Sequence, residues 1–135
     1  MKKYGCIHPQ LSAAIASCGH GDKILIADGN FPLASKCPDA KKVYLGFTCG
    51  IPTVTQVLNM LLSEVYVEAA EVMDPNDGST PPIFREFNEM LGGVQLSAIT
   101  RYEFYDASAS KDVKLAISTG ENRVFANILI TVGVA

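Results

Sequence analysis

Helix-like and strand-like segments alternate along this sequence, and Pro or Gly stands at most of the boundaries between them. Strands are expected at residues 23–28, 42–46, 67–73, 95–99, 113–119 and 126–132. Helices are expected between Pro9 and Gly19, after Pro52, from Pro82 to the Gly92-Gly93 pair, and over residues 101–109. Such alternation favours an α/β fold with three α/β/α layers around a mixed, mostly parallel sheet. The last two strand-like segments carry β-forming residues at alternating positions, so we expect them to pair as a hairpin.

The size and charge of the chain narrow the possible classes of protein. With 135 residues, residues 1–135 are expected to form a single domain. The formal net charge is −3 and no basic run is present, which argues against binding of nucleic acid or of an anionic membrane. No apolar stretch reaches the roughly 18 residues of a membrane span, and His8, Pro9 and Gln10 interrupt the apolar region near the N-terminus, so we expect a cytoplasmic protein. A mean hydropathy of +0.20 is high for a small monomer and suggests that sister subunits cover part of the apolar surface.

The cysteines and histidines raise the question of a metal site. A Cys-x-His step occurs twice, at Cys6-Ile7-His8 and at Cys18-Gly19-His20, and these four side chains are a candidate zinc set. The step is not a common zinc spacing, and a predicted helix separates the two pairs, so buried free thiols are the favoured interpretation. The sequence also has no Gly-rich phosphate loop, no GxSxG motif and no HExxH motif. We therefore expect neither a metal nor a cofactor.

Four polar residues stand where sugar chemistry is possible. Histidine exchanges protons near neutral pH because its reference pKa is about 6.5. His20 lies between two glycines, which either let its ring approach a ligand closely or form an ordinary helix stop and surface turn. Asp28 is expected at the carboxyl end of the first strand, where α/β folds bind small ligands. Arg101 is expected at the first position of a helix, where its guanidinium offers several donors or is merely solvated. Asn127 adds an amide near the start of the last strand, and the four groups together suit binding and acid–base chemistry on a sugar.

Several separated motifs carry a family resemblance. They are GHGD at 19–22, ILIAD at 24–28, NFP at 30–32, RYEFY at 101–105, TGE at 119–121 and FAN at 125–127. In this order, and over nearly the whole chain, they resemble the ribose pyranase / fucose mutarotase family (RbsD/FucU). Agreement of several motifs in order is much more specific than agreement of any one of them. The resemblance implies interconversion of sugar anomers or ring forms without a metal or cofactor.

The resemblance also implies roles for individual residues. His20 would be the catalytic acid, Asp28 would hold substrate hydroxyls, and Arg101 with the segment Phe125-Ala126-Asn127 would complete the pocket. A carboxylate is expected to orient His20, and Asp22 is the candidate. The opposing base is unassigned between water and Asp28. An imidazole in this role typically contributes about 10²–10⁴-fold to the rate.

The substrate and the assembly follow from finer features of the resemblance. The GHGD form and Arg101 resemble the fucose branch, because the ribose branch tends to carry histidine where Arg101 stands. L-fucose is therefore the first expected substrate, and D-ribose is the runner-up. Phe125 stands where the family usually has tyrosine, so one phenolic hydroxyl is missing. The family builds rings of subunits, so we expect a homo-oligomer, specifically a decamer. A non-catalytic sugar-binding accessory of a transporter is the competing interpretation.

Overall fold

A six-stranded sheet with the spatial order β2-β5-β1-β6-β3-β4 forms the centre of the computed structural model, which describes residues 1–135. The pairs β1–β5, β2–β5 and β3–β4 are parallel, whereas β6 runs antiparallel to both of its neighbours, β1 and β3. The sheet is therefore mixed and mostly parallel, as the sequence predicts. The strands are β1 (Lys23–Ala27), β2 (Lys41–Tyr44), β3 (Val67–Met73), β4 (Leu96–Ile99), β5 (Val113–Ser118) and β6 (Ile128–Val132).

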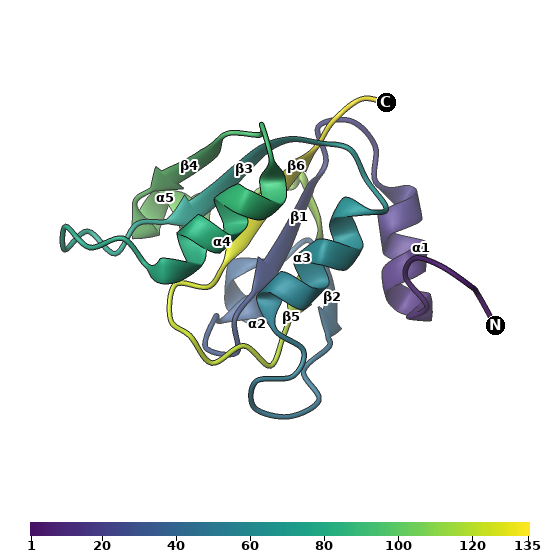
Figure 1. The fold of residues 1–135 in the computed structure, drawn as a ribbon. Coiled ribbons are helices and arrows are strands. Elements are labelled where there is room, and N and C mark those ends of the chain that lie inside the picture. The colour runs from purple at the N-terminus through teal and green to yellow at the C-terminus, as the bar shows by residue number, and fades with distance from the viewer.

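Helices cover both faces of this sheet (Figure 1). On one face lie α1 (Pro9–Ser17), α3 (Val54–Leu62) and α4 (Pro82–Leu91), which share one apolar core with alternate strand residues such as Ile24 and Ile26. On the other face lie the short α2 (Leu33–Lys36) and α5 (Arg101–Ala109), which pack on Leu25 and Ala27 in a second core. Two cores on opposite faces of one sheet confirm the predicted three-layer α/β/α fold.

The predicted hairpin between the last two strands is wrong. Both edges of β5 are already occupied, by β2 and by β1, so β6 has no edge of β5 to pair with. β6 instead inserts between β1 and β3 and satisfies its backbone groups on both sides, which an edge position would not allow. Residues 119–127, which we call the crossover, therefore pass over the carboxyl end of β1 on their way from β5 to β6.

Local hydrogen bonds determine where two of the helices begin. The ring Nδ1 of His8 accepts from the Leu11 N–H at 3.3 Å, so His8 caps α1. At the start of α5, the Thr100 hydroxyl accepts from the Glu103 N–H at 3.3 Å, and the Glu103 carboxylate accepts from the Thr100 N–H at 2.9 Å. This capping box places Arg101 at the first position of α5. None of the helices has the length and apolar character to cross a bilayer.

Strand β1 separates two polar ends of the molecule. Its residues Ile24, Leu25, Ile26 and Ala27 have no exposed surface. His20 lies in the turn before the strand, and Asp28 follows it directly. At about 3.3 Å per strand residue, the five residues of β1 hold these two side chains roughly 16 Å apart or more. Within one chain, His20 and Asp28 are therefore too far apart to contact the same small ligand.

Candidate functional site

A cavity of about 220 Å³ opens at the carboxyl end of β1. Asp28 lines it from the end of β1, Arg101 from the start of α5, and Phe125 and Asn127 from the crossover. Segments that are far apart in the sequence thus supply the predicted sugar-binding groups to one place. The remaining lining residues are Asn30, Phe31, Pro32, Met73, Tyr105 and Val124.

Two of the lining residues, Asp28 and Asn127, are fixed by hydrogen bonds to each other. The Asn127 side-chain amide donates to the Asp28 carboxylate at 3.0 Å, and the Asp28 backbone N–H donates to the Asn127 side-chain oxygen at 2.8 Å. The Asn30 N–H donates to the other carboxylate oxygen at 2.9 Å. Asp28 is only 2% exposed, so these bonds hold its carboxylate in one orientation at the cavity wall.

Burial raises the pKa of Asp28 above its ordinary value, because removal from water disfavours the charged form. Backbone N–H groups of Asn30, Ala126 and Phe31, together with the Asn127 amide, act in the opposite direction and limit the rise. Ala126 is itself fully buried, so it contributes its backbone and not its side chain to this arrangement. A carboxylate in this environment is suited to accepting sugar hydroxyls and to holding a proton during reaction.

Aromatic rings and a cation form the rest of the cavity wall. The Arg101 guanidinium lies over the Phe125 ring, with 6.0 Å between the guanidinium carbon and the ring centroid. Arg101 is exposed and makes no ion pair in the chain, so its donors are free for a ligand. Phe31 packs against Tyr105 at 5.8 Å between ring centroids. Apolar faces beside free guanidinium donors suit a sugar, which presents C–H faces and hydroxyl edges.

Phe125 has a φ of 58°, in the left-handed region that side-chain-bearing residues rarely adopt. Strain of this kind persists only where surrounding contacts hold the backbone, and it is concentrated at functional sites. Here it turns the ring toward the cavity while Ala126 and Asn127 continue into β6.

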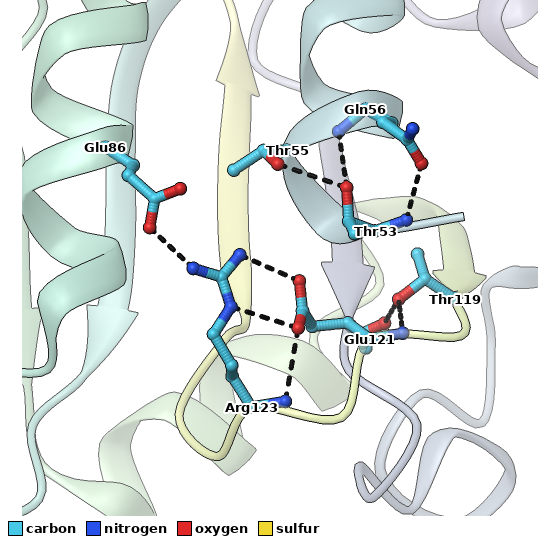
Figure 2. Close-up of polar contacts among 8 residues, drawn as sticks. Thr53, Thr55, Gln56, Glu86, Thr119, Glu121 and Arg123 are labelled. Carbon is cyan, nitrogen blue, oxygen red and sulfur yellow. Dashed lines mark hydrogen bonds and ion pairs between the residues drawn. The ribbon is translucent and has the colours of Figure 1, made fainter. Parts of the chain in front are cut away.

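Side-chain bonds within the first part of the crossover hold it in place (Figure 2). The Arg123 guanidinium donates to both Glu121 carboxylate oxygens at 3.0 Å, and it also reaches Glu86 of α4 at 2.6 Å. The Thr119 hydroxyl donates to the Ala27 carbonyl at 2.8 Å, and the Gly29 N–H donates to the Glu121 carbonyl at 2.8 Å. These bonds tie the crossover to α4 and to the end of β1, and thereby position the Phe125–Asn127 segment.

The Glu121 carboxylate is 2% exposed and has its pKa held below the ordinary range. The bonds from the Arg123 side chain are the main cause, and the Val54 backbone N–H at the start of α3 adds to them. The same ion pair raises the pKa of Arg123. Glu121 therefore remains ionised, as an internal support of the site and not as a proton donor.

His20 and Asp22 lie apart from this cavity, at the amino end of β1. His20 is exposed, and its ring Nε2 lies 2.9 Å from the Glu68 carboxylate of β3. Asp22, the predicted orienting carboxylate, instead accepts from the Gly19 N–H at 2.8 Å. The structure thus brings together Asp28, Arg101 and the Phe125–Asn127 segment, and places the two remaining predicted residues at the opposite end of the strand.

The candidate zinc ligands do not converge. The Cys6 thiol donates to the His8 carbonyl, the Cys18 thiol donates to the Ala14 carbonyl, and the His8 ring caps α1. No group of three or more His, Cys, Asp or Glu side chains is arranged to hold a metal ion. All four cysteines of the chain are free thiols.

Glu68 and Arg123 did not stand out in the sequence, and Glu121 stood out only as the last residue of the TGE motif. Glu121 and Arg123 lie in a polar stretch between Gly120 and Val124, which is typical of a surface turn. Glu68 is one acidic residue in a strand that also contains Glu71. No local signal marks the ion pair of Glu121 and Arg123, because the burial of Glu121 depends on contacts far along the chain.

Comparison with known proteins identifies the family to which the chain belongs. The family described as the RbsD / FucU transport protein family matches residues 1–135. A D-ribose pyranase of Clostridium botulinum is 30% identical, over 99% of this chain and 98% of that protein. The human fucose mutarotase is 35% identical, over 95% of this chain and 89% of that protein.

Solved structures show the same fold. Bacillus subtilis RbsD complexed with D-ribose is 29% identical and superposes with a TM-score of 0.87, covering 100% of this chain and 99% of that one. The fucose mutarotase of Streptococcus pneumoniae in complex with L-fucose is 26% identical, with a TM-score of 0.84 and the same coverage. Because the family match and the relatives extend over essentially the whole length, the chain belongs to the RbsD/FucU family of sugar pyranases and mutarotases.

Proposed function

We propose that this protein is a cytoplasmic mutarotase that interconverts the α and β anomers of L-fucose by opening and reclosing the sugar ring. The observation that carries the proposal is the convergence of Asp28, Asn127, Arg101 and the Phe125 ring on one cavity. A buried carboxylate–amide pair supplies fixed acceptors and donors, a free guanidinium supplies further donors, and the ring supplies an apolar face. This combination matches the hydroxyl edge and C–H face of a monosaccharide.

The reaction needs two proton transfers in each direction. Opening requires loss of the proton of the anomeric hydroxyl and delivery of a proton to the ring oxygen. The C1 aldehyde then rotates, and the hydroxyl attacks its other face with the proton transfers reversed. His20 is proposed as the acid, and Asp28, whose burial makes proton binding more favourable, is a candidate for the opposing base. Uncatalysed mutarotation is already quick, so this small set of groups suffices.

The separation of His20 from the cavity requires a second copy of the chain. Within one chain the whole length of β1 lies between His20 and Asp28. We therefore propose a homo-oligomer, a decamer by family resemblance, in which His20 of one subunit completes the cavity of its neighbour. Exposed apolar side chains at both ends of the molecule, including Tyr66 near His20 and Val124 beside the cavity, are consistent with contacts between copies.

D-ribose pyranase activity is the second candidate, because the relatives include several proteins with that name. L-fucose remains first because Arg101 stands where the ribose branch tends to carry histidine. The human relative named fucose mutarotase is 35% identical, which supports the same choice.

Exchange NMR of the sugar anomers tests the function directly. The exchange rate is measured for L-fucose and for D-ribose, with no protein, with wild type, with His20→Ala and with Asp28→Ala. Faster fucose exchange that both variants abolish supports the proposal, and acceleration confined to ribose reassigns the substrate. Binding without any rate change would show a sugar-binding accessory and reject the enzyme.

Mixing the two inactive variants tests the shared site. If His20 acts on a neighbouring subunit, denaturing and refolding an equal mixture of His20→Ala and Asp28→Ala chains restores about a quarter of the sites, since random assembly unites the two intact residues that often. If both residues act within one chain, the mixture stays inactive.

A further inference from the structure

We propose that Glu68 is a positioning residue that holds the His20 ring in one orientation and in one tautomer. The contact is direct, with 2.9 Å between His20 Nε2 and a Glu68 carboxylate oxygen. The inference rests on the proposed function, in which His20 is the catalytic acid. It replaces Asp22 in the orienting role, because the Asp22 carboxylate is bonded to the Gly19 N–H.

A bulge in β3 directs Glu68 toward this contact. Val67 is paired with Val132 and Ala69 with Thr131, so the strand advances by two residues where β6 advances by one. Glu68 is the extra residue. Bulges re-aim a side chain that would otherwise follow the strict alternation of a strand, and they are frequent next to active sites.

A glycine directly after β6, Gly133, leaves room for Glu68. A Cβ atom on Gly133 would lie 3.2 Å from the Glu68 Cβ and 3.3 Å from its backbone nitrogen, which is closer than most such contacts. The Gly133 N–H donates to the Tyr66 carbonyl at 2.8 Å, which keeps the two segments together. The glycine thus permits the close approach of the backbones that the bulge requires.

The turn that carries His20 is attached to the same end of β6. The Gly21 N–H donates to the Val132 carbonyl at 2.9 Å, and the Val132 N–H donates to the Asp22 carbonyl at 2.9 Å. The Asp22 carboxylate then closes the turn through the Gly19 N–H. Both partners of the His20–Glu68 contact are therefore fixed to the end of one strand, so the contact does not depend on two freely moving side chains.

The chemical consequence follows from which ring nitrogen is bonded. A carboxylate at Nε2 keeps a proton there and leaves Nδ1 as the nitrogen that can exchange a proton with the sugar. A cavity at this end of β1 is lined by His20 and by four other titratable side chains, namely Lys2, Cys18, Glu64 and Tyr66.

Glu68→Gln keeps the size of the side chain, but its amide can accept from Nε2–H or donate to an unprotonated Nε2, so it no longer selects one tautomer. The rate of sugar exchange is measured for wild type, for this variant and for Glu89→Gln, which removes an exposed ion-paired carboxylate from α4. We expect the Glu68→Gln rate to fall by about tenfold, because Nδ1 is no longer held in the form that exchanges a proton with the sugar. Glu89→Gln is expected to match the wild-type rate.

Nitrogen-15 NMR of the histidine rings gives a second readout that needs no activity. The chain has two histidines, so His8 serves as an internal reference in every sample. In Glu68→Gln we expect His20 to lose its preference for the Nε2–H tautomer, while His8 is unchanged. Gly133→Ala, which crowds Glu68 without removing it, should weaken the same preference.

The outcomes separate this inference from the proposed function. An unchanged tautomer and an unchanged exchange rate in Glu68→Gln would overturn the role of Glu68, even if His20→Ala abolishes activity. Absence of sugar exchange in wild type would reject the function, while the ring tautomer would still show whether Glu68 holds His20.

Discussion

Asp28 and Asn127 stand 99 positions apart in the sequence and bond each other twice, both times through the side-chain amide of Asn127. The carboxylate accepts from the amide at 3.0 Å, and the amide oxygen accepts from the backbone of Asp28 at 2.8 Å. The end of β1 and the start of β6 are therefore locked together at the cavity wall. These two side chains stabilise the fold and line the cavity that we propose as the sugar site, so substitutions here are expected to affect both stability and binding.

Asn127→Asp should be destabilising in a pH-dependent way. It places a second carboxylate against Asp28, whose pKa is already raised by burial. At pH 7 the two charges repel, and we expect a loss of about 2 kcal/mol or more in the free energy of unfolding. At pH 5 the pair can share a proton, so the loss should be smaller. Urea unfolding at both pH values measures this, and an equal loss at both would contradict the expectation.

The backbone conformation of Phe125 predicts that glycine is a more stabilising replacement than alanine at this position. Both Phe125→Ala and Phe125→Gly remove the ring and should weaken sugar binding similarly. Because φ is 58°, the glycine variant should be the more stable of the two by about 1 kcal/mol. The neighbouring exposed Val124 provides the control, since its φ is not positive and alanine should there be at least as stable as glycine.

Arg101→Ala should affect binding and leave stability nearly unchanged. The guanidinium is exposed, lines the cavity and forms no ion pair, so its loss removes donors to the ligand and a 6.0 Å contact with the Phe125 ring that contributes little at an exposed site. We expect the fucose dissociation constant to rise about tenfold, which corresponds to about 1.4 kcal/mol. Calorimetric titration measures the affinity, and thermal unfolding the stability. Arg85→Ala on α4 is the matched control, and equal affinity of both variants would place the ligand elsewhere.

Glu121→Gln should make the free energy of unfolding less sensitive to acidic pH. The pKa of Glu121 is lowered in the folded state, so the carboxylate contributes stability above its ordinary pKa, and this contribution is lost as pH falls through the lowered value. The variant should lose about 1–3 kcal/mol at pH 7. Its stability should then change less than that of wild type as pH falls below 5. Chemical unfolding from pH 7 to pH 3 measures this, with Glu89→Gln as the control; parallel curves would contradict the assignment.

Local sequence patterns predicted most of the helices and strands. The one wrong prediction, the hairpin between the last two strands, concerned long-range pairing. The Thr100–Glu103 capping box and the apolar run of β1 are set by neighbouring residues, so they can be recognised in the sequence. The position of β6 depends on which strand edges remain free after the sheet assembles. No periodicity within residues 126–132 contains that information.

The same distinction applies to the site. Asp28, Arg101 and Asn127 were predictable because each stands at the end of a recognisable element. Glu121 was not, because its neighbours are polar and only contacts with Arg123 and the start of α3 bury it. Glu68 was not, because a bulge is a property of the pairing of two strands and not of either strand alone.

The insertion of β6 has a consequence for how the chain is made. The half-sheet β2-β5-β1 and the half-sheet β3-β4 share no direct strand pairing, and β6 alone bridges them. β6 also follows every other strand in the sequence, so the ribosome synthesises it after all of them. The inner edges of β1 and β3 therefore remain unpaired until the last strand emerges and completes the sheet. Asn127 stands immediately before that strand, so the cavity that it lines forms only when the sheet is complete.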